Sequence, residues 1–159
     1  MIFIASDHAG YDLKSFVKDY LSQKEYALCD LGTTSSVQRV DYPDYASLLS
    51  HKLLEANTLY VTTRNSIYNS WNSENLGILI CGSGIGMSMS ANRINGIRAA
   101  LCTSAYMAKM ARLHNDANIL CLGARISGVG EVESILDAFL QTDFEGGRHS
   151  GRVEKIDRG

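Results

Sequence analysis

The chain has 159 residues, of which 45% are hydrophobic and 20% charged, and its 15 basic and 17 acidic side chains give a formal net charge of -2. This length and composition suit a single domain over residues 1–159 with one hydrophobic core. No Lys/Arg block could follow a phosphodiester backbone, no apolar run approaches the ~20 residues of a membrane span, and no signal peptide opens the chain. We therefore expect a cytoplasmic protein that binds neither nucleic acid nor membrane.

Five short apolar runs alternate with helical patterns along the chain. The runs predict strands at 1–6, 27–32, 77–82, 98–103 and 118–123. Apolar side chains recur at helical spacing over 13–21, 45–53, 107–114 and 132–140, and a helix of small residues is expected after 82. This alternation predicts a doubly wound, Rossmann-like (flavodoxin-like) α/β fold, in which helices cover both faces of a five-stranded parallel sheet.

Two segments fall outside this alternation. Residues 57–76 are rich in Asn, Ser and Thr, contain the only Trp, and are predicted to form an inserted loop. Such a long loop is either functional or a surface feature such as an oligomer contact. Residues 145–159 form a Gly-rich, basic C-terminal tail, in which Arg148 and Arg152 share a face if the tail is helical.

The segment CGSGIG at 81–86 is the strongest local signal for chemistry, because it follows a predicted strand at the sheet edge where such folds bind ligands. Its three glycines let backbone N–H groups face an anion. The pattern is neither the dinucleotide fingerprint, since Met87 replaces the last glycine, nor a P-loop. Cys81 opens the turn, and a thiol beside such amides is poised to form a reactive thiolate.

Plainer interpretations of these residues stay open. A glycine turn between strand and helix is often only packing geometry. The widely spaced Cys29, Cys102 and Cys121 are interpreted as inert, reduced thiols in or at the ends of strands, since no C-x-x-C pair is present.

Seven segments, in the same order, resemble the type B ribose-5-phosphate isomerases of the ribose/galactose isomerase family. They are SDHAG at 6–10, DYPDYA at 41–46, CGSGIG at 81–86, GIRAAL at 96–101, RLHNDAN at 112–118, LGAR at 122–125 and EGGRHSGRV at 145–153. The resemblance implies a homodimer, possibly a tetramer, with active sites shared between subunits, a small sugar phosphate as ligand, and no metal or organic cofactor.

The resemblance also implies a reaction, the interconversion of D-ribose 5-phosphate and D-ribulose 5-phosphate through an enediolate, in the non-oxidative branch of the pentose phosphate pathway. By resemblance, His114 opens the sugar ring, Cys81 takes the carbon-bound proton, and Ser83 moves a hydroxyl proton. Some family members use a glutamate as base, but the matching position here is Met87, which cannot act as one.

Substrate binding is likewise implied by resemblance, with sugar contacts from one set of residues and phosphate contacts from His8 and three arginines. The implied substrate-binding residues are Asp7, His8, Tyr42, Gly82, Gly84, Ile85, Gly86, Asn115, Arg125, Arg148 and Arg152.

Alternatives remain for several of these residues and for the function. Without the resemblance, His114 would be read as a core or cap histidine, Asp7 as a helix cap, Tyr42 as a packing residue, and Arg148 and Arg152 as solvated charges. A hexose-phosphate isomerase on the same scaffold is one rival function. A binding module that senses a phosphorylated ligand without chemistry is the other.

Overall fold

The structure, a computed structural model, describes residues 1–63 and 75–158. Five parallel strands form one sheet in the order β2-β1-β3-β5-β4. The strands are β1 (Ile2–Ser6), β2 (Leu28–Asp30), β3 (Leu76–Cys81), β4 (Ala99–Leu101) and β5 (Ile119–Gly123). The predicted fold class is confirmed, and each strand lies within its predicted run except that β3 begins one residue earlier, at Leu76.

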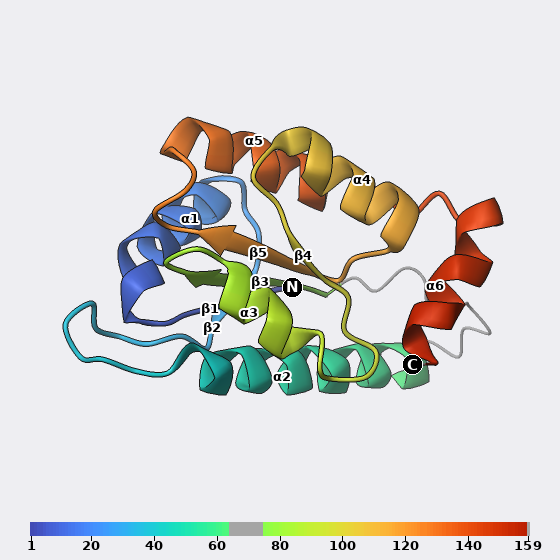
Figure 1. The fold of residues 1–159 in the computed structure, drawn as a ribbon, viewed down its shortest axis with the longest axis horizontal. Coiled ribbons are helices and arrows are strands. Elements are labelled where there is room, and N and C mark those ends of the chain that lie inside the picture. The colour runs from blue at the N-terminus through green and yellow to red at the C-terminus, as the bar shows by residue number, and fades with distance from the viewer. Residues whose placement is uncertain (64–74, 159) are drawn as a thin grey trace.

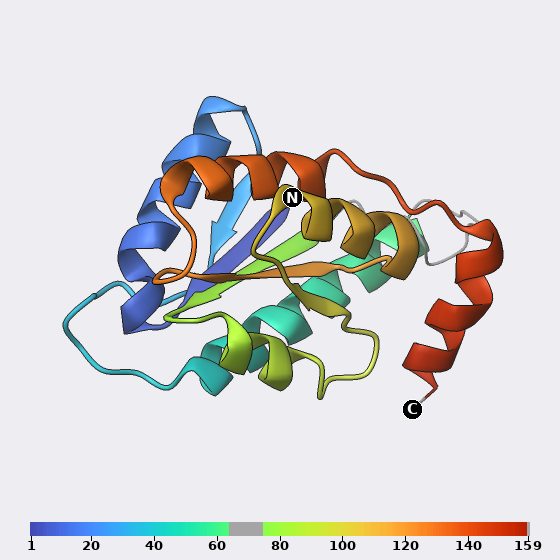
Figure 2. The same ribbon diagram turned by 45° about the horizontal axis from the view of Figure 1, so that its top comes forward.

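Helices cover both faces of this sheet, as Figure 1 and Figure 2 show. One layer holds α1 (Tyr11–Gln23), α4 (Ala105–Asn115) and α5 (Val129–Leu140), and the other holds α2 (Tyr42–Thr63) and α3 (Ile85–Ala91). Two short 3-10 turns, η1 (His8–Gly10) and η2 (Gly147–His149), precede α1 and α6 (Ser150–Asp157). Helix α6 lies apart from the two layers, beside the C-terminal end of α4.

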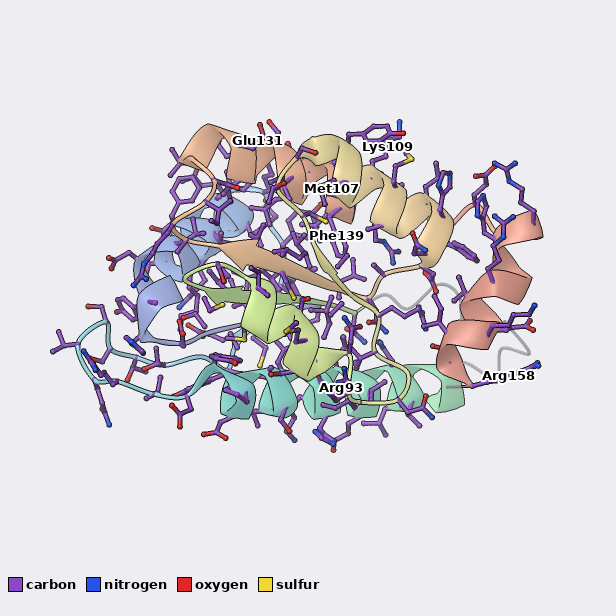
Figure 3. The ribbon with its side chains drawn as sticks, viewed as in Figure 1. Arg93, Met107, Lys109, Glu131, Phe139 and Arg158 are labelled. Carbon is purple, nitrogen blue, oxygen red and sulfur yellow. The ribbon has the colours of Figure 1, made fainter. Side chains whose placement is uncertain are left out.

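The hydrophobic core has two parts because the central strands are buried on both faces. Every residue of β1, β3 and β5 is buried, which explains why these strands appear in the sequence as continuous apolar runs. On one side α5 contributes the fully buried Phe139 (Figure 3). On the other side Leu49 of α2 and Met87 of α3 are fully buried. Among the described residues, no helix has the length and hydropathy needed to cross a membrane.

The strand order places the topological switch point of the sheet between β1 and β3. The chain passes from β1 outward to β2, returns to β3 on the other side of β1, and continues away from it. Ligands bind such sheets where the crossovers diverge, outside the carboxyl ends of the strands. The last two strands are exchanged relative to the flavodoxin order 2-1-3-4-5.

The predicted loop at 57–76 is wrong at both of its ends. Residues 57–63 continue helix α2, and Leu76 belongs to β3. Some of the polar side chains bond within the fold, since Thr58 Oγ1 donates to Leu54 O at 2.8 Å and Asn75 Nδ2 donates to Asn57 Oδ1 at 3.0 Å. Composition therefore misled the prediction. The rest of the predicted loop, 64–74, lies outside the described residues.

Candidate functional site

The sequence-predicted residues lie in two groups at opposite ends of the sheet. Strands β1 and β3 end on the left in Figure 1, whereas α4 ends and α6 lies on the right, beside the amino ends of the strands. The carboxyl-end group consists of Asp7, His8, Tyr42, Cys81, Gly82, Ser83, Gly84, Ile85, Gly86 and Arg125. The amino-end group consists of His114, Asn115, Arg148 and Arg152. One chain therefore does not bring Cys81 and His114 together.

Cys81 is the last residue of β3, and it is buried with an exposed fraction of 5%. The backbone N–H of Gly84 donates to its sulfur at 3.2 Å. Gly84 adopts φ +77° in this turn, a conformation that favours glycine. Ser83 belongs to the same turn, where its Oγ accepts a hydrogen bond from the N–H of Ile85 at 3.3 Å. The local sequence thus builds an N–H-lined turn around one thiol.

Neighbouring strands and helices supply the walls of this turn. A Cβ atom on Gly86 would lie 2.6 Å from the ring of Tyr42, which is the first residue of α2. A Cβ atom on Gly82 would lie 3.5 Å from Nη1 of Arg125, whose own N–H donates to Gly82 O at 3.0 Å. Two of the glycines are therefore contact points for the residues that were predicted to bind substrate.

Asp7 and His8 lie just after β1, next to this turn. Asp7 is buried, and its Oδ1 accepts from Gly10 N at 3.0 Å, so the helix-cap role considered for it is real. The N–H of Asp7 donates to Ile80 O at 3.3 Å, which ties it to β3. His8 Nδ1 lies 3.3 Å from both backbone polar atoms of Val40, in the segment that leads to Tyr42.

His114 lies in the last turn of α4, where the C-terminal tail returns to the body of the protein. Its ring stacks on that of His149, with centroids 4.3 Å apart and planes inclined by 9°. Glu145 Oε2 lies 3.7 Å from His114 Nε2 and 3.6 Å from His149 Nε2. The N–H of Glu145 donates to Leu113 O at 3.0 Å, so the backbone of the tail is fixed beside His114.

A buried ion network holds the same end of α4 in place. Arg98 Nη2 donates to Asp116 Oδ2 at 2.8 Å, and Arg112 Nη1 donates to Asp116 Oδ1 at 3.3 Å. Arg98 Nη1 also bonds Asp157 of α6, at 3.0 and 3.1 Å. Asp116 ends α4 with φ +46°. The network fixes the segment that carries His114 and Asn115 and attaches α6 to it.

Sequence reasoning missed Glu145, His149 and the arginine–aspartate network. Glu145 and His149 stood inside a family-like segment, and their spacing of four residues was the available signal for a shared face. Arg98, Asp116 and Asp157 gave no local signal, because their contacts join residues 18 and 59 positions apart.

Two of the other cysteines, Cys102 and Cys121, have raised pKa values, which is consistent with their predicted inert role. All four cysteines are free thiols. Burial raises the pKa of Cys102 to about 11. Burial also raises the pKa of Cys121 well above its ordinary value, and the nearby thiols of Cys81 and Cys102 add smaller contributions in the same direction. Neither Cys102 nor Cys121 forms a thiolate readily at neutral pH.

The fold and the site define a three-layered α/β domain. Its topological switch point, the place where such sheets bind small molecules, lies at the carboxyl ends of β1 and β3. The ribose/galactose isomerase family model matches residues 2–156. A probable ribose-5-phosphate isomerase B of Mycoplasma pneumoniae is 47% identical over 155 residues, which cover 98% of this chain and 91% of the relative. The chain belongs to the ribose/galactose isomerase family, and it is a sugar phosphate isomerase.

Solved structures agree with this assignment. Ribose 5-phosphate isomerase B of Thermotoga maritima is 46% identical, with a TM-score of 0.85, over 99% of this chain and 97% of the other. The Mycoplasma genitalium enzyme, solved with bound ribulose-5-phosphate, is 41% identical, with a TM-score of 0.82, over 99% and 93% of the two chains.

Proposed function

We propose that the protein interconverts D-ribose 5-phosphate and D-ribulose 5-phosphate, with Cys81 as the base. The observation that carries this proposal is the buried sulfur of Cys81, which accepts an N–H bond in a glycine turn flanked by Asp7, Tyr42 and Arg125. A relative at 41% identity binds the ketose of this pair, which supports the choice of substrate.

The chemistry divides among three side chains. His114 opens the furanose ring by moving a proton between the ring oxygen and the C1 hydroxyl. The Cys81 thiolate then takes the proton from C2, which leaves an enediolate, and the resulting thiol returns a proton to C1. Ser83 carries the remaining proton from the C2 oxygen to the C1 oxygen. Backbone N–H groups of residues 82–86, with Asn115, stabilise the negative oxygen of the intermediate.

We infer that a complete site needs two copies of the chain, because Cys81 and His114 lie at opposite ends of one sheet. One copy supplies the carboxyl-end group, and the other supplies His114, Asn115 and the tail arginines. Exposed apolar side chains on α3 and α4, on either side of the edge strand β4, support a contact between copies there. They are Ile85, Met89, Tyr106 and Met107, the last labelled in Figure 3.

The phosphate group of the substrate is then bound from both copies. His8 and Arg125 approach it from the carboxyl-end group, and Arg148 and Arg152 approach it from the tail of the partner. Arg148 and Arg152 are both exposed, at η2 and in the first turn of α6. Guanidinium groups suit this task because they bind phosphate oxygens in pairs.

Proton exchange tests the role of Cys81. During turnover in D₂O the sulfur exchanges its proton with solvent, so NMR should show deuterium at C1 of ribulose 5-phosphate. Cys81→Ala should abolish both this exchange and turnover, whereas Cys29→Ser, a control thiol in β2, should leave both unchanged. Normal turnover by Cys81→Ala would reject the base assignment. Turnover of six-carbon phosphates faster than ribose 5-phosphate would reject the substrate.

Mixing two inactive variants tests the shared site. A mixed dimer of Cys81→Ala and His114→Ala chains contains one complete site if each site takes Cys81 and His114 from different copies. Random pairing makes half of the dimers mixed, so unfolding and refolding the mixture should restore about a quarter of the normal activity. If both residues act within one copy, the mixture stays inactive.

A further inference from the structure

The stacked pair of His114 and His149 is not explained by the chemistry above, which uses only His114. The two rings are nearly parallel, at 9°, with centroids 4.3 Å apart. They come from different elements, the end of α4 and the 3-10 turn η2. His114 has a side chain that is 34% exposed, whereas that of His149 is 7% exposed. One ring is therefore accessible to a ligand and the other supports it from inside.

His149 is held in place by its neighbours. Arg148 Nε lies 3.2 Å from His149 Nε2, and it donates to this nitrogen when the proton of the neutral ring is on Nδ1. Burial, together with the neighbouring His114 and Arg148, lowers the pKa of His149. A neutral ring that is fixed by its surroundings restrains a ring stacked on it without adding charge.

A metal ion held by His114, Glu145 and His149 is the other function that this cluster suggests, since their ligand atoms lie within 4.8 Å of one another. An imidazole binds a metal in the plane of its ring. Two stacked, parallel rings lie in separate planes, so their nitrogens do not converge on one ion. The observed geometry therefore favours mutual support of the rings over metal binding.

We propose that His149 is a positioning residue that orients two groups at once, the ring of His114 by stacking and the guanidinium of Arg148 by accepting its Nε–H bond. This inference rests on the proposed function, because it concerns the ring-opening and phosphate-binding roles given to those two residues. His149 itself touches no substrate. Its effect is to hold the ring-opening group and a phosphate-binding group in a fixed relation to each other.

The two substrates of the reaction separate this role from a structural one. Ribose 5-phosphate is a closed ring that must open before C2 loses its proton. Ribulose 5-phosphate is an open chain, because its only hydroxyl able to close a five-membered ring carries the phosphate. Exchange of the C1 proton of ribulose 5-phosphate with solvent therefore needs Cys81 but no ring opening.

The test compares these two measurements in His149→Ala. We expect kcat for ribose 5-phosphate to fall about 10- to 100-fold, the usual effect of a displaced catalytic group. The rate at which the C1 proton of ribulose 5-phosphate exchanges with solvent, measured at saturating substrate in D₂O, should stay within about threefold of the rate of the unsubstituted protein. His51→Ala is the matched control, since His51 is exposed on α2 and its ring bonds Ser47 of the same helix. It should change neither rate.

His149→Phe is the second variant, because it keeps a ring to stack on His114 but removes the acceptor for Arg148. It should retain kcat for ribose 5-phosphate within about threefold and raise KM. Equal losses of turnover and exchange in His149→Ala, unchanged turnover in that variant, or a collapse of kcat in His149→Phe would each overturn the proposal. Absence of exchange by the unsubstituted protein would instead reject the proposed function.

Discussion

At the scale of single residues, Gly84 is the position on which the turn around Cys81 depends. Its φ of +77° disfavours any other residue, and a Cβ atom there would lie 2.5 Å from Leu101 Cδ1 and 2.9 Å from the carbonyl carbon of Leu122. The backbone of Leu122 belongs to the interior strand β5 and cannot give way easily. The N–H of Gly84 also binds the Cys81 sulfur, so strain at this residue reaches the proposed base directly.

We expect Gly84→Ala to lower the free energy of unfolding by about 2 kcal/mol or more, from the left-handed backbone conformation and the clash together. In the same variant, the rate at which the C1 proton of ribulose 5-phosphate exchanges with solvent should also fall. Urea denaturation and NMR measure the two effects. Gly130→Ala is the control, because Gly130 lies in α5 with nothing within 4 Å of an added Cβ atom. A Gly84→Ala protein as stable as the control would contradict the prediction.

At the scale of elements, one buried lysine joins α1, β2 and the loop that follows β2. Lys14 Nζ donates to both Asp30 carboxylate oxygens, at 2.7 and 3.0 Å, and to Thr33 O at 2.7 Å. Lys18 adds a second ion pair to Asp30 at 2.7 Å. The loop then runs on to Val40, which contacts His8. This ion pair therefore supports one wall of the carboxyl-end group.

Asp30→Asn should destabilise the protein in a pH-dependent way. Burial opposes the charge on Asp30, but hydrogen bonds from Lys14, Lys18 and the N–H of Gly32 outweigh it, so the pKa of Asp30 is lowered. A lowered folded-state pKa stabilises the fold fully above the unfolded value, about 3.9, and this contribution disappears as pH falls through the folded value.

The substitution should therefore cost about 2 kcal/mol of unfolding free energy at pH 7, and progressively less as pH falls below about 4. Urea denaturation across this range provides the measurement. Asp19→Asn makes the same chemical change at an exposed site on α1, and it should lower the free energy of unfolding only slightly at any pH. A loss for Asp30→Asn that stays constant down to low pH would mean that its charge is not the cause.

At the scale of the whole molecule, a polar connection joins α6 to the end of α4. Val153 is its only buried residue. Asp157 near its end bonds Arg98, which in turn bonds Asp116 beside the end of α4. If α6 reaches the site of a second copy, as proposed, the placement of Arg152 depends on this connection.

We expect Asp157→Asn to loosen α6 while leaving the core intact. Amide hydrogen exchange in 150–157 should speed up, and KM for ribose 5-phosphate should rise several-fold. Global stability should change by less than about 1 kcal/mol, because the pair is partly exposed. Glu154→Gln, which removes an exposed pair with Arg158 on the same helix, is the control. Unchanged KM with faster exchange would show that the attachment of α6 does not affect binding.

The sequence by itself determined the strand–helix alternation and the parallel sheet, because buried strands and amphipathic helices leave periodic patterns in local sequence. It also drew attention to the glycine turn at 81–86. Its prediction for 57–63 was wrong, since the side-chain bonds to Leu54 and Asn75 are invisible to composition.

Only the tertiary structure decided the exchanged order of β4 and β5, the separation of Cys81 from His114 within one chain, and the ring of His149 behind His114. Each of these depends on contacts between residues that are distant in sequence. Such contacts are selected by packing of the complete chain, which leaves no periodic trace in any local segment.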